Sequence, residues 1–253
     1  MKVTFLGTGT SQGIPVIGST HPVCLSENEK DKRLRVSIMI THNKNVYVID
    51  CGPDFRAQML RQNATKLDAI LFTHEHADHT AGLDDIRPFF FKQGDIPIYA
   101  HQRVLQSLRR RFDYIFETEN KYPGAPSVQV NRITNNSFFL EDLKVIPING
   151  MHNNLQVFGF RFKDFAYLTD MKTVADEEIE KLKNVDVLVV NALREKEHIS
   201  HFNLEEALAF IVKVNPKKAY LTHISHWLGF HDEVQQKLPE NVYLAYDGLT
   251  INL

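Results

Sequence analysis

The chain has little cysteine, a single tryptophan and no long apolar run. Its 253 residues include only Cys24 and Cys51, too few for a disulfide framework, so each is expected to fill the core or bind a metal. No stretch approaches the ~20 apolar residues that span a bilayer, and the N-terminus lacks the apolar region of a signal peptide. We therefore expect a cytoplasmic protein that makes no membrane contact.

An excess of positive charge is also missing. Lys and Arg number 29 against 31 Asp and Glu, which gives a net charge of -2. Nucleic-acid binding depends largely on neutralising phosphates with Lys and Arg, so this balance argues against a nucleic-acid partner.

What the chain does have is a mixture of strand and helix signals with 43% hydrophobic residues, enough for a sizeable core. We predict strands at 3–6, 37–41, 46–50, 69–73, 96–99, 143–148, 157–162, 166–169, 185–190, 219–222 and 242–245. We predict helices at about 53–62, 102–112, 175–182, 203–214 and 231–238. We expect one domain over 1–253, with 87–128 as a lid-like insertion or a homodimer surface.

A glycine-rich turn, Gly7-Thr8-Gly9-Thr10, follows the first strand. It does not complete a phosphate-binding motif, because Gln12 occupies the position of the third glycine. A tight turn at the strand exit is therefore favoured over a phosphate loop.

The densest chemical signal is T-H-E-H-A-D-H at 73–79, directly after an apolar run. Imidazole and carboxylate are ligands for divalent metals, and His74 and His76, two apart on an extended loop, can face one ion. Asp78 and His79 point elsewhere, since adjacent side chains diverge. The pattern predicts two ions, with Glu75 and Ala77 as spacers.

This motif resembles the H-x-H-x-D-H signature of the metallo-β-lactamase superfamily. The similarity extends to Asp50 in V-I-D-C-G, His152 in N-G-M-H-N, Asp170 in Y-L-T-D and His223 in L-T-H-I-S-H. It implies an α+β fold, a four-layer αββα sandwich with two mixed β-sheets. It also implies a ligand set in which His74, His76 and His152 hold one metal, Asp78, His79 and His223 hold the other, and Asp170 bridges both.

The resemblance places Asp50 behind the ligands, where a carboxylate fixes the tautomer of a ligand histidine. Without a thiolate, these ligands suit zinc, manganese or iron, and we expect two Zn or Mn ions. Two ions ~3.5 to 4 Å apart can generate a hydroxide nucleophile at neutral pH, with Asp78 among the catalytic groups. The chain is thus predicted to be a hydrolase.

Within the superfamily, the chain is most similar to the branch of tRNase Z and the PhnP-like cyclic phosphodiesterases. The similarity lies in F-L-G-T-G-T near the start, 191–207, 221–226 and the terminal A-Y-D-G-L. It implies that His201, or less favourably His198, faces the phosphate, where a protonated imidazole stabilises charge or protonates the leaving group.

Spacing separates the alternatives within that branch. In tRNase Z a basic arm typically lies between the residues that match His152 and Asp170, which here are only 18 residues apart. A small phosphodiester, cyclic ones included, is therefore the expected substrate. An RNA-processing nuclease of the tRNase Z type and a thioesterase or lactonase remain the alternatives.

One part of the resemblance is incomplete. The PhnP-like enzymes carry a C-x-C-x-x-C cluster that, with a histidine beyond the last ligand, binds a structural zinc. This chain has Ser19, His21 and Cys24 at the three cysteine positions, and it retains the later histidine as His226. Closed structural zinc sites have four protein ligands, and only three are present here. Both alternatives, a bound structural zinc and no zinc at this place, therefore remain open.

Overall fold

The computed structural model describes residues 1–119 and 121–253, and within them the strands form two sheets. The first has seven strands in the order β15 (Thr250–Asn252), β1 (Lys2–Gly7), β2 (Ser37–His42), β3 (Asn45–Ile49), β4 (Ala69–Leu71), β5 (Ile96–His101) and β6 (Val128–Ile133). The pairs from β15 to β3 are antiparallel and those from β3 to β6 are parallel, so the sheet is mixed.

The second sheet repeats this plan with eight strands. Its order is β11 (Thr173–Val174), β8 (Leu143–His152), β9 (Leu155–Phe162), β10 (Phe165–Tyr167), β12 (Val187–Asn191), β13 (Lys218–Thr222) and β14 (Val242–Leu244), with β7 (Phe138–Leu140) paired to β8. Antiparallel pairing from β11 to β10 changes to parallel pairing from β10 to β14.

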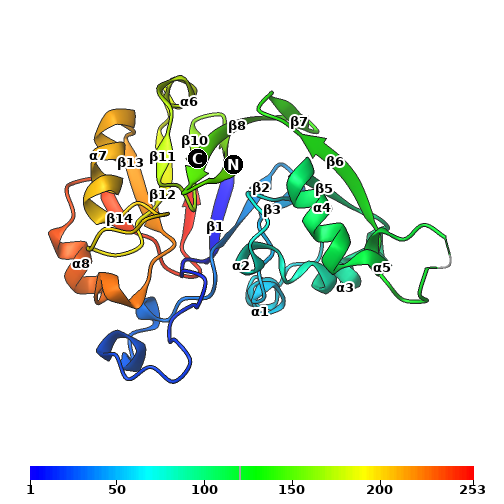
Figure 1. Ribbon diagram of the computed structural model, residues 1–253, viewed down its shortest axis with the longest axis horizontal. Coiled ribbons are helices and arrows are strands. Elements are labelled where there is room, and N and C mark those ends of the chain that lie inside the picture. Colours follow the sequence, from blue (N-terminus) through cyan, green and yellow to red (C-terminus); the bar gives the residue numbers. More distant parts are fainter. Residues whose placement is uncertain (120) are drawn as a thin grey trace.

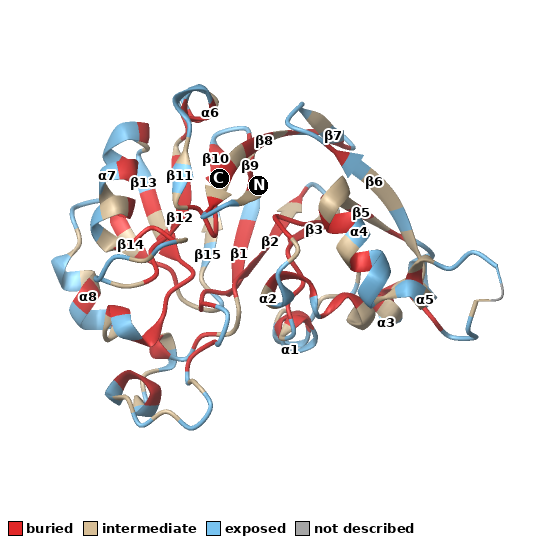
Figure 2. Ribbon diagram, viewed as in Figure 1, coloured by how far each residue is buried: buried red, intermediate tan, exposed pale blue. Residues whose placement is uncertain are grey.

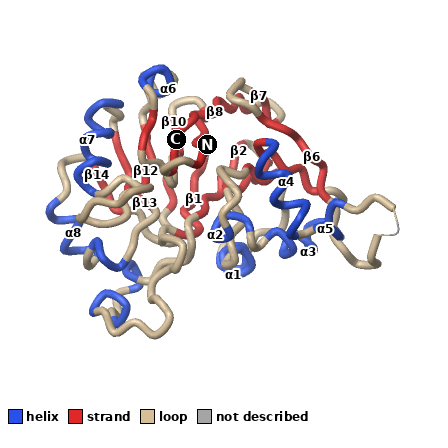
Figure 3. The backbone as a smooth tube through the Cα atoms, viewed as in Figure 1, coloured by secondary structure: helices blue, strands red, loops and turns tan. Residues whose placement is uncertain are grey.

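Helices cover the outer face of each sheet (Figures 1 and 3). On the first sheet these are α1 (Phe55–Arg61), α3 (Arg87–Gln93), α4 (Gln102–Arg111) and α5 (Asp113–Phe116), and on the second α6 (Asp176–Glu180), α7 (Leu204–Val214) and α8 (His231–Lys237). The short α2 (Ala77–Thr80) and the 3-10 turns η1 (Pro22–Leu25), η2 (Glu29–Asp31), η3 (Leu83–Ile86) and η4 (His226–Leu228) complete the elements. No helix of the described residues is both long and apolar enough to cross a membrane.

Three apolar clusters separate these layers, and Figure 2 shows the buried residues along the strands and the inner helix faces. The cluster between the sheets joins Phe5 and Ile38 of the first sheet to Phe158 and Tyr167 of the second. A second cluster packs α1, α3 and α4 on the first sheet, and a third packs α6, α7 and α8 on the other. The predicted αββα sandwich with two mixed sheets is therefore confirmed.

The helix preceded by His201 begins with a strong local signal. Asn203 accepts a hydrogen bond from the Glu206 backbone N–H, and the Glu206 carboxylate accepts from the Asn203 N–H, a reciprocal capping box. Asn215 ends α7 in the left-handed conformation. The helix therefore starts at Leu204 and fixes where the segment before it enters the site.

The segment 87–128 differs from the predicted lid-like insertion. β5 lies inside the first sheet between β4 and β6, and α4 buries Val104, Leu105 and Leu108 in the cluster on that sheet. The strand and α4 are thus integral to the layer, because their apolar side chains complete its core.

The Gly7–Thr10 turn lies against the exit of β13. The Thr10 N–H donates to the Ile224 carbonyl at 3.0 Å, and the Ile224 N–H donates to the Thr8 carbonyl at 2.9 Å. Thr8 also donates its hydroxyl to Asp247 at 2.8 Å, in the A-Y-D-G-L motif. The turn therefore supports the backbone next to His223, as a strand-exit turn.

Candidate metal centre

The site residues sit where strands end. β3 and β4 run parallel and lead into Asp50 and the 73–79 motif, while β8, β10 and β13 lead into His152, Asp170 and His223. β8 and β10 both run antiparallel to β9, so they point in the same direction, and β10, β12 and β13 are parallel. The three strands β8, β10 and β13 therefore end at one edge of the second sheet. The two sheets bring these edges together, which places the side chains around one point.

Backbone conformation helps to aim three of these side chains. Asp50, Asp170 and His223 have φ values of 63°, 56° and 55°, in the left-handed region that non-glycine residues seldom adopt. Such strained residues cluster at functional sites, where the surrounding structure holds them. Each strand thus ends in a sharp turn that points a polar side chain inward.

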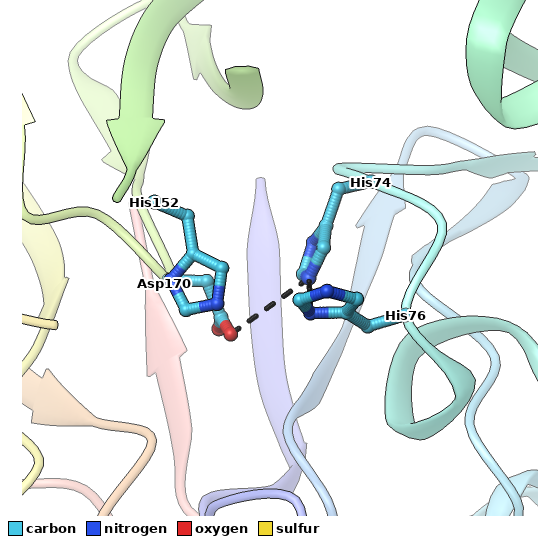
Figure 4. Close-up of side chains that lie close together, drawn as sticks. All are labelled: His74, His76, His152 and Asp170. Atoms are coloured by element: carbon cyan, nitrogen blue, oxygen red, sulfur yellow. Dashed lines mark hydrogen bonds and ion pairs between the residues drawn. The ribbon is translucent and has the colours of Figure 1, made fainter. Parts of the chain in front are cut away.

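The first group of converging ligand atoms comes from His74, His76, His152 and Asp170, which all lie within 4.8 Å of one another. Figure 4 shows His152 and Asp170 facing His74 and His76. The nearest ring nitrogens of His74 and His76 are 2.9 Å apart, and His74 Nε2 lies 3.8 Å from Asp170 Oδ2. This is the group expected to hold one metal.

The second group contains Asp78, His79, Asp170 and His223, again within 4.8 Å. His223 Nε2 lies 3.1 Å from Asp170 Oδ1, and His79 Nε2 lies 3.3 Å from Asp78 Oδ2. Asp170 belongs to both groups through its two oxygens, as a bridging ligand must. The structure therefore brings together all seven predicted ligands in the predicted division.

Electrostatics at this point favour bound cations. Burial raises the pKa of Asp170, but the charges of His223 and His79 outweigh it and hold that pKa well below its usual range. Burial lowers the pKa of His74 well below its usual value, so its ring is neutral. Among the described residues, the buried Nε2 atoms of His79 and His223 have no hydrogen-bond partner. Burial lowers the pKa of His79, but the Asp78 and Asp170 carboxylates outweigh it and raise that pKa well above its usual value, so the ring carries a proton that a bound ion would displace. Ionised carboxylates, the neutral His74 ring and the converging ring nitrogens fit divalent metal ions.

Asp50 lies behind the ligands, as predicted. One of its oxygens accepts from His79 Nδ1 at 2.7 Å and from the Thr73 hydroxyl at 2.8 Å, and the other accepts from the Thr73 N–H at 2.9 Å. His152 is held similarly, because its Nδ1 donates to the Ser200 carbonyl at 2.7 Å. Both contacts leave Nε2 free to face an ion.

His201 contacts both groups. Its ring stacks on His223 with centroids 4.7 Å apart, lies 4.4 Å from the His152 ring, and places Nδ1 3.9 Å from Asp170 Oδ2. Burial lowers the pKa of His201 to about 2, so the imidazole is neutral rather than protonated as we expected. His198 is further out, with its Nδ1 accepting from the Ser200 N–H at 3.3 Å.

The comparisons with known proteins agree with this geometry. A family model described as "Beta-lactamase superfamily domain" matches residues 45–224. The chain belongs to this superfamily. A solved structure described as a new diphosphatase from the PhnP family is 38% identical, with a TM-score of 0.93, and the match covers all of this chain and 97% of that one.

Curated relatives carry two different names. An octanoyltransferase of Porphyromonas gingivalis is 42% identical over 98% of this chain, and a ribonuclease Z of Bacillus licheniformis is 25% identical over 65% of it. The matches cover 51% and 49% of those proteins. The chain thus spans about half the length of the curated relatives it matches.

Glu75, interpreted from the sequence as a spacer inside the superfamily motif, has a structural role. Its carboxylate accepts from Arg103 Nε at 2.7 Å, and its backbone carbonyl accepts from Arg111 at 3.1 Å. Arg111 also donates to the Thr80 hydroxyl at 2.8 Å, which donates to the His76 carbonyl at 2.7 Å. We call Glu75, Arg103 and Arg111 the α4 clamp, since it ties α4 to the metal-binding loop. A glutamate and an arginine 28 positions apart give no pattern that sequence reasoning could use.

A second set of histidines, the outer histidines His21, His226 and His231, lies away from the metal centre. The His21 and His226 rings are 5.0 Å apart, but His21 Nδ1 accepts from the Val23 N–H at 3.3 Å and Cys24 Sγ accepts from the Val16 N–H at 3.5 Å. Among the described residues, only the two groups above gather three or more ligand atoms within 4.8 Å. The additional zinc at His21, Cys24 and His226 stays a prediction.

Proposed function

We propose that this chain is a single-domain hydrolase that uses two divalent ions, Zn or Mn, to cleave a small phosphodiester. The position of the His201 ring carries the proposal, because a nitrogen donor beside both ligand groups is placed to contact an oxygen of a bound phosphate. The similarity to a diphosphatase from the PhnP family supports chemistry at a phosphate group.

In this proposal His74, His76 and His152 bind one ion, Asp78, His79 and His223 bind the other, and Asp170 binds both. When bound there, two divalent ions would supply a nucleophile derived from water at neutral pH and would stabilise charge on phosphate oxygens.

The protein's own groups then orient the ligand rings and stabilise charge on the phosphate. Asp50 and the Ser200 carbonyl hold His79 and His152 in the tautomers that present Nε2. The neutral His201 ring donates a hydrogen bond to a phosphate oxygen and stabilises the negative charge that builds there.

An RNA substrate is less well supported. The segment between His152 and Asp170, which are 18 positions apart, contains the Asn153–Asn154 turn, β9 and β10, so nothing in this segment extends outward as an RNA-gripping arm. The net charge of -2 gives no compensating attraction. The similarity to a ribonuclease Z therefore supports shared chemistry more than a shared substrate.

Acyl ester or thioester hydrolysis is a second candidate, because a relative with 42% identity is named an octanoyltransferase. The same metal centre can attack a carbonyl carbon. A carbonyl needs fewer contacts on its oxygens than a phosphate, so His201 would matter less for that reaction.

The test compares bis(p-nitrophenyl) phosphate with octanoyl-coenzyme A and a lactone on the wild type, His201→Ala and His198→Ala. We expect diester hydrolysis to fall by about 10²- to 10³-fold in His201→Ala and by far less in His198→Ala, because of the two only His201 contacts both ligand groups. Diester turnover that persists in Asp78→Ala or after chelation would contradict the proposal. Faster turnover of the thioester than of any diester would favour the second candidate.

A further inference from the structure

Beside the metal centre a pocket of about 450 Å³ opens next to His76 and His152. We call it the edge pocket, and beyond those two histidines it is lined by Asn153, Asn154, Leu155, Ile199 and Ser200. Its volume is in the range of small-molecule sites. Because two candidate metal ligands form its inner wall, a group attached to a phosphate at the ions would extend into it.

The chemical character of the edge pocket is uncharged. None of its lining residues is Lys, Arg, Asp or Glu. Ile199 is 74% exposed and Leu155 is half-buried, so the pocket offers apolar surface to a ligand. Asn153 and Asn154 are exposed, and their side-chain amides make no hydrogen bond to the described residues. A second phosphate would find no Lys or Arg among the lining residues, whereas an uncharged ring with polar atoms on its edge finds both apolar and polar contacts.

The pocket walls are tied to the metal centre and so keep their position. Asn153, with a φ of 55°, forms the two-residue turn between β8 and β9, and the paired strands hold that turn. The opposite wall carries Ile199 next to Ser200, whose carbonyl accepts from His152 at 2.7 Å. A ligand in the pocket is therefore held at a fixed place relative to the ions.

We infer that the edge pocket binds the ester group that stays on the phosphate, and that this group is an uncharged ring of the aryl or nucleoside type. The inference rests on the proposed phosphodiesterase function and names the class of diester. A nucleic-acid backbone, which would bring further negative charge into the pocket, is disfavoured by the same surface.

Two diesters with one leaving group test this inference: bis(p-nitrophenyl) phosphate and methyl p-nitrophenyl phosphate. They differ only in the ester that is retained. We expect the wild type to prefer the aryl diester by about 10-fold in kcat/KM, beyond their ratio in uncatalysed hydrolysis. Ile199→Asp should remove most of this preference by raising KM for the aryl diester, since it puts a charge on the apolar wall. Ile199→Leu, which keeps the wall apolar, should retain the preference.

The matched control is Ile17→Asp, because Ile17 is fully exposed and does not line the pocket. It should keep the wild-type preference, and the metal content of each variant should equal that of the wild type by mass spectrometry. Equal losses on both diesters in Ile199→Asp, or no aryl preference in the wild type, would overturn the inference. Wild-type protein that hydrolyses neither diester would instead contradict the proposed function.

Discussion

The histidines of the metal centre and the outer histidines differ in what surrounds their ring nitrogens. In the metal centre, Asp78 and Asp170 lie within 3.4 Å of His79 Nε2, and Asp50 holds the other nitrogen of that ring. Around the outer histidines the ring atoms face backbone N–H groups, an arginine and other aromatic rings. The same residue type thus serves as a candidate ligand in one region and as packing in the other.

This difference shows how far the donor atoms of the two regions are gathered toward one point. His21, Cys24 and His226 include good zinc ligands, yet their donor atoms are spread and partly used by backbone N–H groups. In the candidate metal centre the donor atoms converge because strands from the two sheets end at one point, and carboxylates lie among the imidazoles. Five predictions sharpen this comparison, beginning with the largest expected effect.

Replacing Asp170 with Asn should abolish the centre, since this carboxylate contacts both groups. We expect diester turnover to fall by at least about 10³-fold and the metal content to drop below two ions per chain. The measurements are kcat and metal analysis by mass spectrometry. Asp176→Asn, which changes an exposed carboxylate on α6, is the control, and equal turnover in the two variants would remove Asp170 from the centre.

Asp50→Asn should weaken the centre without removing a ligand. The amide cannot accept hydrogen bonds from both His79 and Thr73 with the same strength, so the His79 ring loses its fixed tautomer. We expect metal affinity to fall by about 10- to 100-fold, measured by competition with a chelating dye. Unchanged affinity would show that the tautomer of His79 needs no carboxylate.

His231 should make the outer region sensitive to acid. Burial, with Arg33 and Lys30 nearby, lowers the pKa of His231 to about 4, below the ~6.5 of an unfolded chain. Below pH 6.5 the unfolded state therefore binds a proton that the folded state does not bind. The free energy of unfolding falls with pH until about pH 4, where the folded state also binds this proton. We expect this group to cost about 2 kcal/mol between pH 7 and pH 5.

Denaturant unfolding of the wild type and His231→Gln at pH 7 and pH 5 measures that cost. Gln retains an acceptor for Arg33, which donates to His231 Nδ1 at 3.0 Å. The variant should lose less stability than the wild type over this interval. Parallel losses in the two proteins would show that His231 is not held neutral.

The α4 clamp should have a smaller effect on the metal centre. Glu75→Gln weakens the contact with Arg103 but keeps the backbone carbonyl that Arg111 uses. We expect a few-fold loss in kcat with an unchanged metal content, because the loop still carries its ligands but is held less rigidly. Glu119→Gln, an exposed glutamate, is the control, and a similar loss there would argue against the clamp.

The smallest expected effect concerns the outer histidines. We expect purified protein to bind two zinc equivalents and His21→Ala to keep both, since the donor atoms near His21 are not gathered at one point. Zinc titration with a chromophoric chelator gives the count. Three equivalents in the wild type, with one lost in His21→Ala, would show that His21, Cys24 and His226 close around a structural zinc.

Much of this arrangement could be predicted from the sequence. The 73–79 motif and the isolated His152, Asp170 and His223 each follow an apolar run, and that placement led to the ligand set. The left-handed φ angles of Asp50, Asp170 and His223 could not be predicted, because they depend on how each turn packs. For the same reason the neutral state of His201 was missed, since burial decides it.

Other structural features depended on tertiary contacts. The short strands β7, β11 and β15 have two or three residues each and carry too little periodicity to be recognised. Glu75 was taken for a spacer because its partner Arg103 belongs to a distant helix. The segment 87–128 looked like an insertion because it is rich in aromatic residues and partly helical, although β5 within it pairs directly with β4.

The division of the ligands between the two sheets has a consequence for assembly of the protein. Four of the seven candidate ligands follow β4, and the other three follow strands of the second sheet. A chain with only one sheet in place offers each ion an incomplete set of donors, so tight occupancy begins only when the sheets dock. Metal uptake by a refolding chain would therefore report the docking event itself, and chelation would loosen the halves of the sandwich against each other.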